Sequence, residues 1–333
     1  MNLFKLWVLI FLFSCGNQAQ EEAVRFMGEA QGTYYSIIYF DEQQRDFQVE
    51  VDSILKAFDQ SLSLWVPNSL ISLVNRGDTA IEPDQFLADN FNIEQAVAEK
   101  TNGALDPTVG NLTRAWGFGF DASKKVDKHI IDSILEFTGY RKVRIRNGYL
   151  VKDDPRISID FNAIAQGYSV DLIGTFIEEK GIENYLVDIG GEVKARGNKP
   201  DGSKWKVGIE KPAENRDDTR DLKAVAQLKN KSIATSGNYR KFYEEDGIRY
   251  SHTIDPESGY PVQHSLLSVS VLADNTAIAD AYATAFMVMG LEKARQFVND
   301  DPTLEAFFIY ADEEGNYQTS MSDGFKAVIS EEY

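Results

Sequence analysis

Cys15 is the only cysteine among the 333 residues of this chain, so no disulfide can form within it. A fold without such a cross-link must be held together by the packing of its core. The composition allows this, because 43% of the residues are hydrophobic and 12% are aromatic, as in globular proteins. The chain is long enough for one large domain or for two closely joined lobes.

The surroundings of Cys15 resemble an export signal. Met1 to Lys5 carries one positive charge, and Leu6 to Phe13 is an unbroken apolar run that is too short to be a permanent membrane span. A small residue, Ser14, then precedes the lone cysteine, as in a bacterial lipobox. A plain signal peptide followed by a chance cysteine is the alternative interpretation.

The chain is therefore predicted to have a lipoprotein signal peptide over residues 1–14, a lipidated cysteine with a polar tether over residues 15–23, and a folded domain over residues 24–333. Acyl chains on Cys15 would anchor the protein in a membrane of the bacterial cell envelope, facing the periplasm. The formal net charge of −18 argues against a nucleic-acid partner, because phosphates need a basic surface.

Short β-rich runs alternate with segments of helical periodicity in the folded part. Strands are predicted over residues 32–40, 140–145, 149–152, 157–159, 184–189, 205–210, 222–228 and 266–272. Helices are predicted over residues 44–61, 69–74, 86–101, 161–180 and 277–289. Asn147-Gly148 is a hairpin signal. This order predicts an α+β fold with mixed, mainly antiparallel sheets.

Two glycine-rich or small-residue blocks could bind a ligand through their backbone. Thr101 to Gly110 frames Asp106 with two turn signals, which suit either a ligand loop or an ordinary loop after a helix cap. In the block from Ile157 to Asp171, a β run meets a helix whose first turn holds Asn162 and alanines. The N–H groups of such a turn suit a phosphate, although Asp160 or Asn162 could simply cap the helix.

Three further motifs contain polar residues that could take part in catalysis or metal binding. Val187 to Glu192 ends a β run in Gly-Gly, which alone indicates only a tight turn. Ser236, His252 and Asp255 invite a hydrolase triad, but the nucleophile-elbow pattern is absent. Asp280 and Thr284 are spaced i and i+4 on a predicted helix, so both side-chain oxygens share one face and could bind Mg²⁺. The common alternative is an exposed Asp and a Thr bonded back into its helix.

Together these blocks resemble the ApbE family of FAD:protein FMN transferases. The matching segments, in the family's order, are GTYYSI (32–37), TNGALDPTVGNLTRAWGFG (101–119), DFNAIAQGYSVD (160–171), VDIGGE (187–192), ATSGNYR (234–240), SHTIDPESGYP (251–261) and ADAYATA (279–285). The resemblance covers nearly all of the predicted domain. It implies a two-lobed single catalytic domain related to the T-fold.

The resemblance also implies an activity, a metal and a partner. Members of the family bind FAD and a divalent ion, usually Mg²⁺, and transfer FMN to a threonine or serine of an exported acceptor flavoprotein, releasing AMP. The acceptor is expected to be a subunit of a redox complex. The alternatives are an FAD pyrophosphatase that gives FMN and AMP, and a non-enzymatic FAD-binding lipoprotein.

The residues that the resemblance assigns fall into three groups. The implied FAD-binding residues are Gln31, Trp65, Ala104, Leu105, Asp106, Asp160, Gln166 and Ile254. The implied metal ligands are the Ala163 carbonyl and the Asp280 and Thr284 side chains. We add His252 as the candidate base, because imidazole titrates near neutral pH.

Two positions depart from the family's pattern. The family's Met-Gly-Thr is Gln31-Gly32-Thr33 here, and the usual lysine of its AKGY motif is Gln166. The second change removes a positive charge near the expected phosphates, so the metal must neutralise more of their charge.

Overall fold

The computed structural model describes residues 22–77, 81–118, 126–212, 221–238, 242–245 and 248–333. The largest sheet in this part of the chain has eight antiparallel strands, in the order β1-β2-β5-β6-β9-β12-β13-β14. These strands are β1 (Ala23–Ala30), β2 (Thr33–Phe40), β5 (Tyr185–Ile189), β6 (Glu192–Arg196), β9 (Lys231–Gly237), β12 (Leu266–Ala273), β13 (Glu305–Ala311) and β14 (Tyr317–Met321).

Three smaller antiparallel sheets complete the β structure of the described residues. One contains β7 (Trp205–Glu210), β8 (Leu222–Leu228) and β15 (Ile329–Glu332). The hairpin of β3 (Val143–Arg146) and β4 (Tyr149–Lys152) follows a 3₁₀ turn over Tyr140–Lys142. The hairpin of β10 (Phe242–Glu245) and β11 (Ile248–Ser251) leads into the His252 loop.

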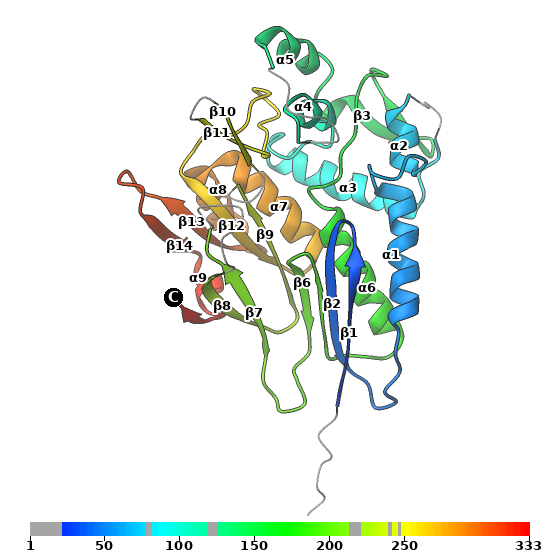
Figure 1. The fold of residues 1–333 in the computed structure, drawn as a ribbon, viewed down its shortest axis with the longest axis vertical. Coiled ribbons are helices and arrows are strands. Elements are labelled where there is room, and N and C mark those ends of the chain that lie inside the picture. Colours follow the sequence, from blue (N-terminus) through cyan, green and yellow to red (C-terminus); the bar gives the residue numbers. More distant parts are fainter. Residues whose placement is uncertain (1–21, 78–80, 119–125, 213–220, 239–241, 246–247) are drawn as a thin grey trace, which may run out of the picture.

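Helices cover one face of the large sheet and the three-stranded sheet covers the other (Figure 1). The helices are α1 (Gln48–Leu62), α2 (Leu70–Asn75), α3 (Gln85–Lys100), α4 (Gly110–Ala115), α5 (Lys128–Leu135), α6 (Ala165–Glu179), α7 (Thr276–Met289), α8 (Leu291–Asp300) and α9 (Asp323–Lys326). In Figure 1, α4 and α5 lie at the end of the molecule opposite the start of β1.

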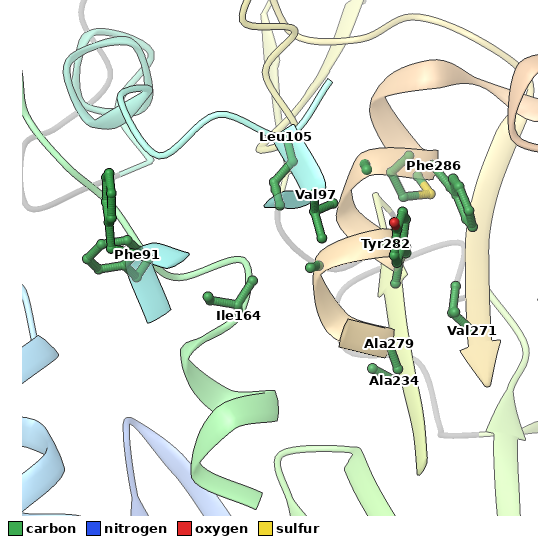
Figure 2. Close-up of a cluster of buried hydrophobic side chains, with 14 of the residues drawn as sticks. Phe91, Val97, Leu105, Ile164, Ala234, Val271, Ala279, Tyr282 and Phe286 are labelled. Atoms are coloured by element: carbon green, nitrogen blue, oxygen red, sulfur yellow. The ribbon is translucent and has the colours of Figure 1, made fainter. Parts of the chain in front are cut away.

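The main hydrophobic cluster joins the helices that carry the predicted site. Figure 2 shows Ile164, from the turn before α6, in the same cluster as Val97 and Leu105 near the end of α3 and Tyr282 on α7. These side chains are nearly inaccessible to solvent, and burying each of them stabilises the fold by about 1.5–3 kcal/mol. The apolar contacts therefore fix α3, α6 and α7 relative to one another.

The predicted fold class is confirmed, although several predicted elements differ. Strand β1 was not predicted, and Gln31 and Gly32, both with positive φ, form the two-residue turn that pairs it with β2. Helix α6 begins at Ala165 rather than Phe161. Residues 157–159 are not a strand, because the Asn75 side-chain amide bonds both the N–H and the C=O of Ile159, at 2.7 and 2.8 Å.

The anchoring predictions fall outside the described residues, since these begin at Glu22. They include the signal peptide, Cys15 and most of the tether. In the part of the chain that the structure does describe, the helices all lack the length and apolar character of a membrane span.

Candidate active site

The Thr101–Gly110 segment is shaped by the carboxylate of Asp106. Its Oδ1 accepts hydrogen bonds from the N–H and hydroxyl of Thr108, at 2.8 and 2.6 Å, and its Oδ2 accepts one from Tyr140 N–H at 2.7 Å. Burial raises the pKa of Asp106, and the hydrogen bonds from Thr108 oppose that rise. Asp106 thus folds the segment that presents Ala104 and the buried Leu105.

A main-chain hydrogen bond joins this segment to the block from Ile157 to Asp171. The N–H of Asp160 donates to the carbonyl of Pro107 at 2.8 Å. The Asp160 carboxylate accepts from Asn162 N–H at 2.9 Å and so stabilises the turn that carries Ala163 and leads into α6. Two blocks that are about 50 residues apart in sequence are therefore in direct contact.

Helix α6 then meets α7 at a glycine. Gly167 N–H, in the first turn of α6, donates to Oδ2 of Asp280 at 3.1 Å. A side chain at Gly167 would meet the Thr276 carbonyl at 2.6 Å and the Asp280 Cβ at 2.8 Å, so only glycine permits this approach. The small-residue pattern in this block therefore serves close helix packing.

Asp280 is a buried acid in this junction, with only 6% of its surface exposed. Burial raises its pKa well above the ordinary value, the negative charge of Glu192 adds to the rise, and the Gly167 N–H opposes it. Glu192 is itself buried at the start of β6, directly after the Gly-Gly turn. A cation bound at Asp280 would offset the cost of ionising this buried carboxyl.

Thr284, one turn further along α7, forms a hydrogen bond with Ser236 of β9, with 3.1 Å between the hydroxyl oxygens. The alternative expectation of an exposed Asp at position 280 is therefore wrong. A carboxylate and a hydroxyl on one helix face, next to buried negative charge, fit a hard divalent ion. In the described residues there is no group of three or more His, Cys, Asp or Glu side chains suited to a metal. A metal here would use hydroxyl and main-chain oxygens as well.

The two glutamines that depart from the family's pattern lie near each other's segments, Gln166 in the first turn of α6 and Gln31 in the β1–β2 turn. The Ser169 hydroxyl oxygen is 2.7 Å from the Gln166 carbonyl oxygen and 3.4 Å from Gln31 Oε1. Gln31 Nε2 is buried without a hydrogen-bond partner. The amide nitrogen of Gln166 lies over Gly190, where a Cβ would come within 2.5 Å of it. The start of α6 therefore lies next to both the β1–β2 turn and the Gly-Gly turn.

The His252 loop packs on α4 and α5. The indole N–H of Trp116 donates to the Gly259 carbonyl at 2.7 Å, and the buried Ile254 side chain contacts the cluster of Leu112, Trp116 and Ile131. Ile254 pairs with Pro261 in an isolated β-bridge, and the hydrogen bonds of this bridge are made by Thr253 O and Asp255 N. The N–H and C=O of Ile254 therefore point away from Pro261. A ligand contact at this residue would use its backbone.

The remaining predicted residues lie on segments other than α6 and α7. The His252 ring packs edge-on against Phe118, with 6.3 Å between the ring centres. Trp65 lies in the turn between α1 and α2 and is 64% exposed. Asp255 accepts hydrogen bonds from Glu257 and Ser258 N–H and so shapes its own loop. The ends of two matching segments, Gly119 and Tyr239–Arg240, are outside the described residues.

One buried acid near the site was not predicted. Glu94 lies on α3, 1% exposed, and the charges of Asp160, Asp106 and Asp280 all act on it. Its position between Phe91 and Val97, on the apolar side of the predicted helix, was the available signal.

Comparison with known proteins identifies the family. The ApbE family profile matches residues 31–308, and the chain belongs to the ApbE family. A relative from Vibrio cholerae, named FAD:protein FMN transferase, is 33% identical over 98% of both chains. The protein of that name from Escherichia coli K12 is 32% identical, over 97% of this chain and 95% of its own.

Solved structures agree with this assignment. The flavin transferase ApbE from Vibrio cholerae superposes with a TM-score of 0.82 at 32% identity, covering 92% of this chain and 99% of its own. The apo flavinyl transferase ApbE from Pseudomonas stutzeri gives a TM-score of 0.84 at 31% identity, with coverage of 94% and 98%. The expected α+β, single-domain architecture is therefore that of the family.

Proposed function

We propose that this protein transfers FMN from FAD to a threonine or serine hydroxyl of an exported acceptor flavoprotein and releases AMP. The observation that carries the proposal is the α6–α7 junction. It places the buried Asp280 against the first turn of α6, one turn from Thr284 and close to the block that begins at Asp160. Family membership supplies the chemistry that such a junction would serve.

FAD would lie across the segments that the fold brings together. We assign the flavin to the Ala104–Asp106 segment and the Ile254 backbone, and the Trp65 ring, which is 64% exposed, would stack on a ring of FAD. Asp160, Gln31 and Gln166 would contact the ribose and pyrophosphate end. In the first turn of α6 the N–H groups of Ala165 and Gly167 already bond to Phe161 O and to Asp280, so it is the positive end of the helix dipole that would favour phosphate oxygens at the same place.

Asp280, Thr284 and the Ala163 carbonyl would hold a magnesium ion. Once bound, such an ion neutralises pyrophosphate charge and polarises the phosphorus that is attacked. The Ser236 hydroxyl accepts or donates one hydrogen bond at Thr284 and so orients the threonine oxygen. Gly167 N–H does the same for Asp280.

The transfer step exchanges the phosphoanhydride bond of FAD for a phosphoester bond to the acceptor. The acceptor hydroxyl oxygen forms a bond to the phosphorus next to riboflavin, and the bond from that phosphorus to the bridging oxygen breaks. AMP leaves with that oxygen, and the hydroxyl proton passes to His252. Positioning and charge neutralisation supply most of the rate enhancement in such reactions.

The anchoring part of the proposal is a lipid on Cys15 that holds the protein at the periplasmic side of a bacterial membrane. The start of β1 and the α4–α5 end lie at opposite ends of the molecule (Figure 1). An anchor near residue 15 would therefore leave the His252 loop facing away from the membrane. Metabolic labelling with a fatty acid, compared between the wild type and Cys15→Ser, tests this assignment.

The deciding experiment follows covalent flavin and AMP separately. Wild-type protein is incubated with FAD and MgCl₂, with and without a purified exported redox subunit. We expect in-gel flavin fluorescence on a threonine of that subunit, and AMP release only when it is present. Fast AMP release without the subunit would instead indicate an FAD pyrophosphatase, and tight FAD binding without any turnover would indicate a carrier.

Two substitutions assign the roles. Asp280→Asn is expected to lower transfer by at least about 100-fold because it removes an anionic ligand. His252→Ala is expected to lower kcat with little change in FAD affinity. Near-normal transfer by His252→Ala would show that the base is another group.

A further inference from the structure

Glu94 is an acid in a place where an ionised carboxylate is costly. It lies on α3, on the same face as the buried Phe91 and Val97, and only 1% of its surface is exposed. Its Oε2 atom is buried and makes no hydrogen bond in the described part of the chain. A charged carboxylate in such surroundings is destabilised unless it is paired or protonated.

The charges that act on Glu94 in the described part of the chain are negative. Asp160, Asp106 and Asp280, from three different segments of the candidate site, each raise its pKa, and burial raises it more than any of them. Both effects favour the protonated carboxyl, which has one O–H donor that needs an acceptor.

Asn90, one turn earlier on α3, has the matching acceptor. Its side chain is fully buried and its Nδ2 donates to the Phe86 carbonyl at 2.8 Å. Only the amide nitrogen can bond to a carbonyl, so the orientation of this amide is fixed. Its Oδ1 is buried and has no partner.

The helix geometry brings these two side chains toward each other. Residues i and i+4 share a face, and long helical side chains point back toward the N-terminus, so Glu94 extends toward Asn90. Each side chain has one buried oxygen without a partner, and one proton between them satisfies both.

We propose that Glu94 is a positioning residue: its carboxyl O–H donates to Oδ1 of Asn90, and this acid–amide pair holds the C-terminal half of α3 beneath the candidate site. That half of α3 leads directly into the Thr101–Asp106 segment. The neighbouring Gln95 donates through Nε2 to the Tyr140 carbonyl at 3.1 Å, so this half of the helix is also tied to the residue whose N–H holds Asp106. The inference rests on the proposed function only in naming FAD as the ligand of that site.

The test compares two substitutions of full-length protein. Glu94→Gln keeps a donor that can bond to Asn90 Oδ1, whereas Glu94→Met keeps the size and removes the donor. FAD binding is measured by fluorescence quenching without magnesium and without an acceptor. We expect Glu94→Gln to bind FAD within about 2-fold of the wild type and Glu94→Met to bind about 10-fold more weakly. Equal losses in both variants would overturn the proposal.

A spectroscopic signature tests the proton directly, whether or not the protein transfers FMN. Infrared difference spectra at neutral pH between the wild type and Glu94→Gln should show a protonated carboxyl stretch in the wild type. The exposed Glu99→Gln on the same helix is the control and should leave this band unchanged. Absence of this band from the wild-type spectrum would contradict the proposal.

The pH profile of stability provides a third readout. In the unfolded chain Glu94 loses its proton near its ordinary pKa of 4.5, while the folded protein keeps it to higher pH. The wild type should therefore lose stability relative to Glu94→Gln as the pH rises from about 5 to 8. A difference in Tm that stays constant over this range would contradict the proposal.

Discussion

Gly167 and Asp280 join α6 to α7 through a hydrogen bond of 3.1 Å from a backbone N–H to a carboxylate. One turn further along α6 the relationship is reversed, because the Asp171 carboxylate accepts from Ala277 N–H at 2.9 Å and from the Thr276 hydroxyl at 3.2 Å. Lys194 of β6 completes this second tie with an ion pair to Asp171 at 2.9 Å. Each helix thus binds the N-terminal part of the other, and the predicted metal ligands lie on that fixed frame.

Gly167→Ala is expected to disturb this frame. The new methyl group would meet backbone and side-chain atoms at 2.6 and 2.8 Å, so α6 and α7 must move apart at a cost of about 1–3 kcal/mol. Chemical denaturation measures the loss of stability, and calorimetric titration measures a weaker magnesium affinity. Gly202→Ala is the control, because it has open space around it and costs only its strained φ, without an effect on magnesium.

Asp106→Asn tests whether Asp106 acts by folding its loop. The amide oxygen can still accept from Thr108, but the amide nitrogen then faces Tyr140 N–H and leaves that donor without an acceptor. The expected loss is about 1–3 kcal/mol in the free energy of unfolding. Asp132→Asn, which breaks an exposed ion pair with Lys128, should change stability by only a few tenths of a kcal/mol. A stable Asp106→Asn variant with weakened FAD binding would show that the carboxylate contacts the ligand itself.

Gln166→Lys restores the positive charge that the family usually has at this position. We expect FAD to bind several-fold more tightly, with a steeper loss of affinity as the salt concentration rises, because the gain is electrostatic. Gln166→Met, of similar length but uncharged, should not show the salt dependence. Fluorescence titrations at low and high salt distinguish the two, and equal salt slopes would place Gln166 away from the phosphates.

Asp41 gives the fold a defined sensitivity to acid. Arg45 hydrogen bonds to its carboxylate at 2.8 and 2.9 Å and lowers the pKa of Asp41 from 3.8 to about 2. Because the folded pKa is lowered, this contribution to stability is complete above the unfolded pKa and is lost as the pH falls from about 4 to 2. Asp41→Asn should therefore be less stable than the wild type at neutral pH, with a difference that shrinks in acid. Unfolding curves from pH 2 to pH 7 check this, and a gap that widens in acid would contradict it.

The sequence allows the fold class to be predicted because periodicity is a local property. Alternating residues in β2 and helical spacing in α7 each report burial on one side. Strand β1 is harder to predict, since Gly28 and the exposed Met27 weaken its alternating pattern. It forms because it pairs with β2. The Ile157–Ile159 run has the right residue types for a strand, but Asn75 provides its hydrogen bonds.

The candidate site was predictable as a set of segments but not as a set of contacts. Asp106 and Asp160 stand out as acids in turn-rich blocks, yet the bond between Asp160 and Pro107 depends on tertiary packing. Glu94 has no motif around it, and its role depends on burial that a single sequence shows only as helical spacing. The sequence therefore indicates which residues are candidates, whereas their contacts depend on long-range packing.

Several of the ties that hold the site use main-chain atoms: Asp160 N to Pro107 O, Tyr140 N to Asp106, and Gly167 N to Asp280. Main-chain donors remain when a neighbouring side chain changes. Positions such as Gln31 and Gln166 can therefore exchange residues during evolution while the scaffold beneath them keeps its shape. On the proposed assignment of these two glutamines to FAD, a change at either position would alter the ligand contacts and leave the scaffold as it is.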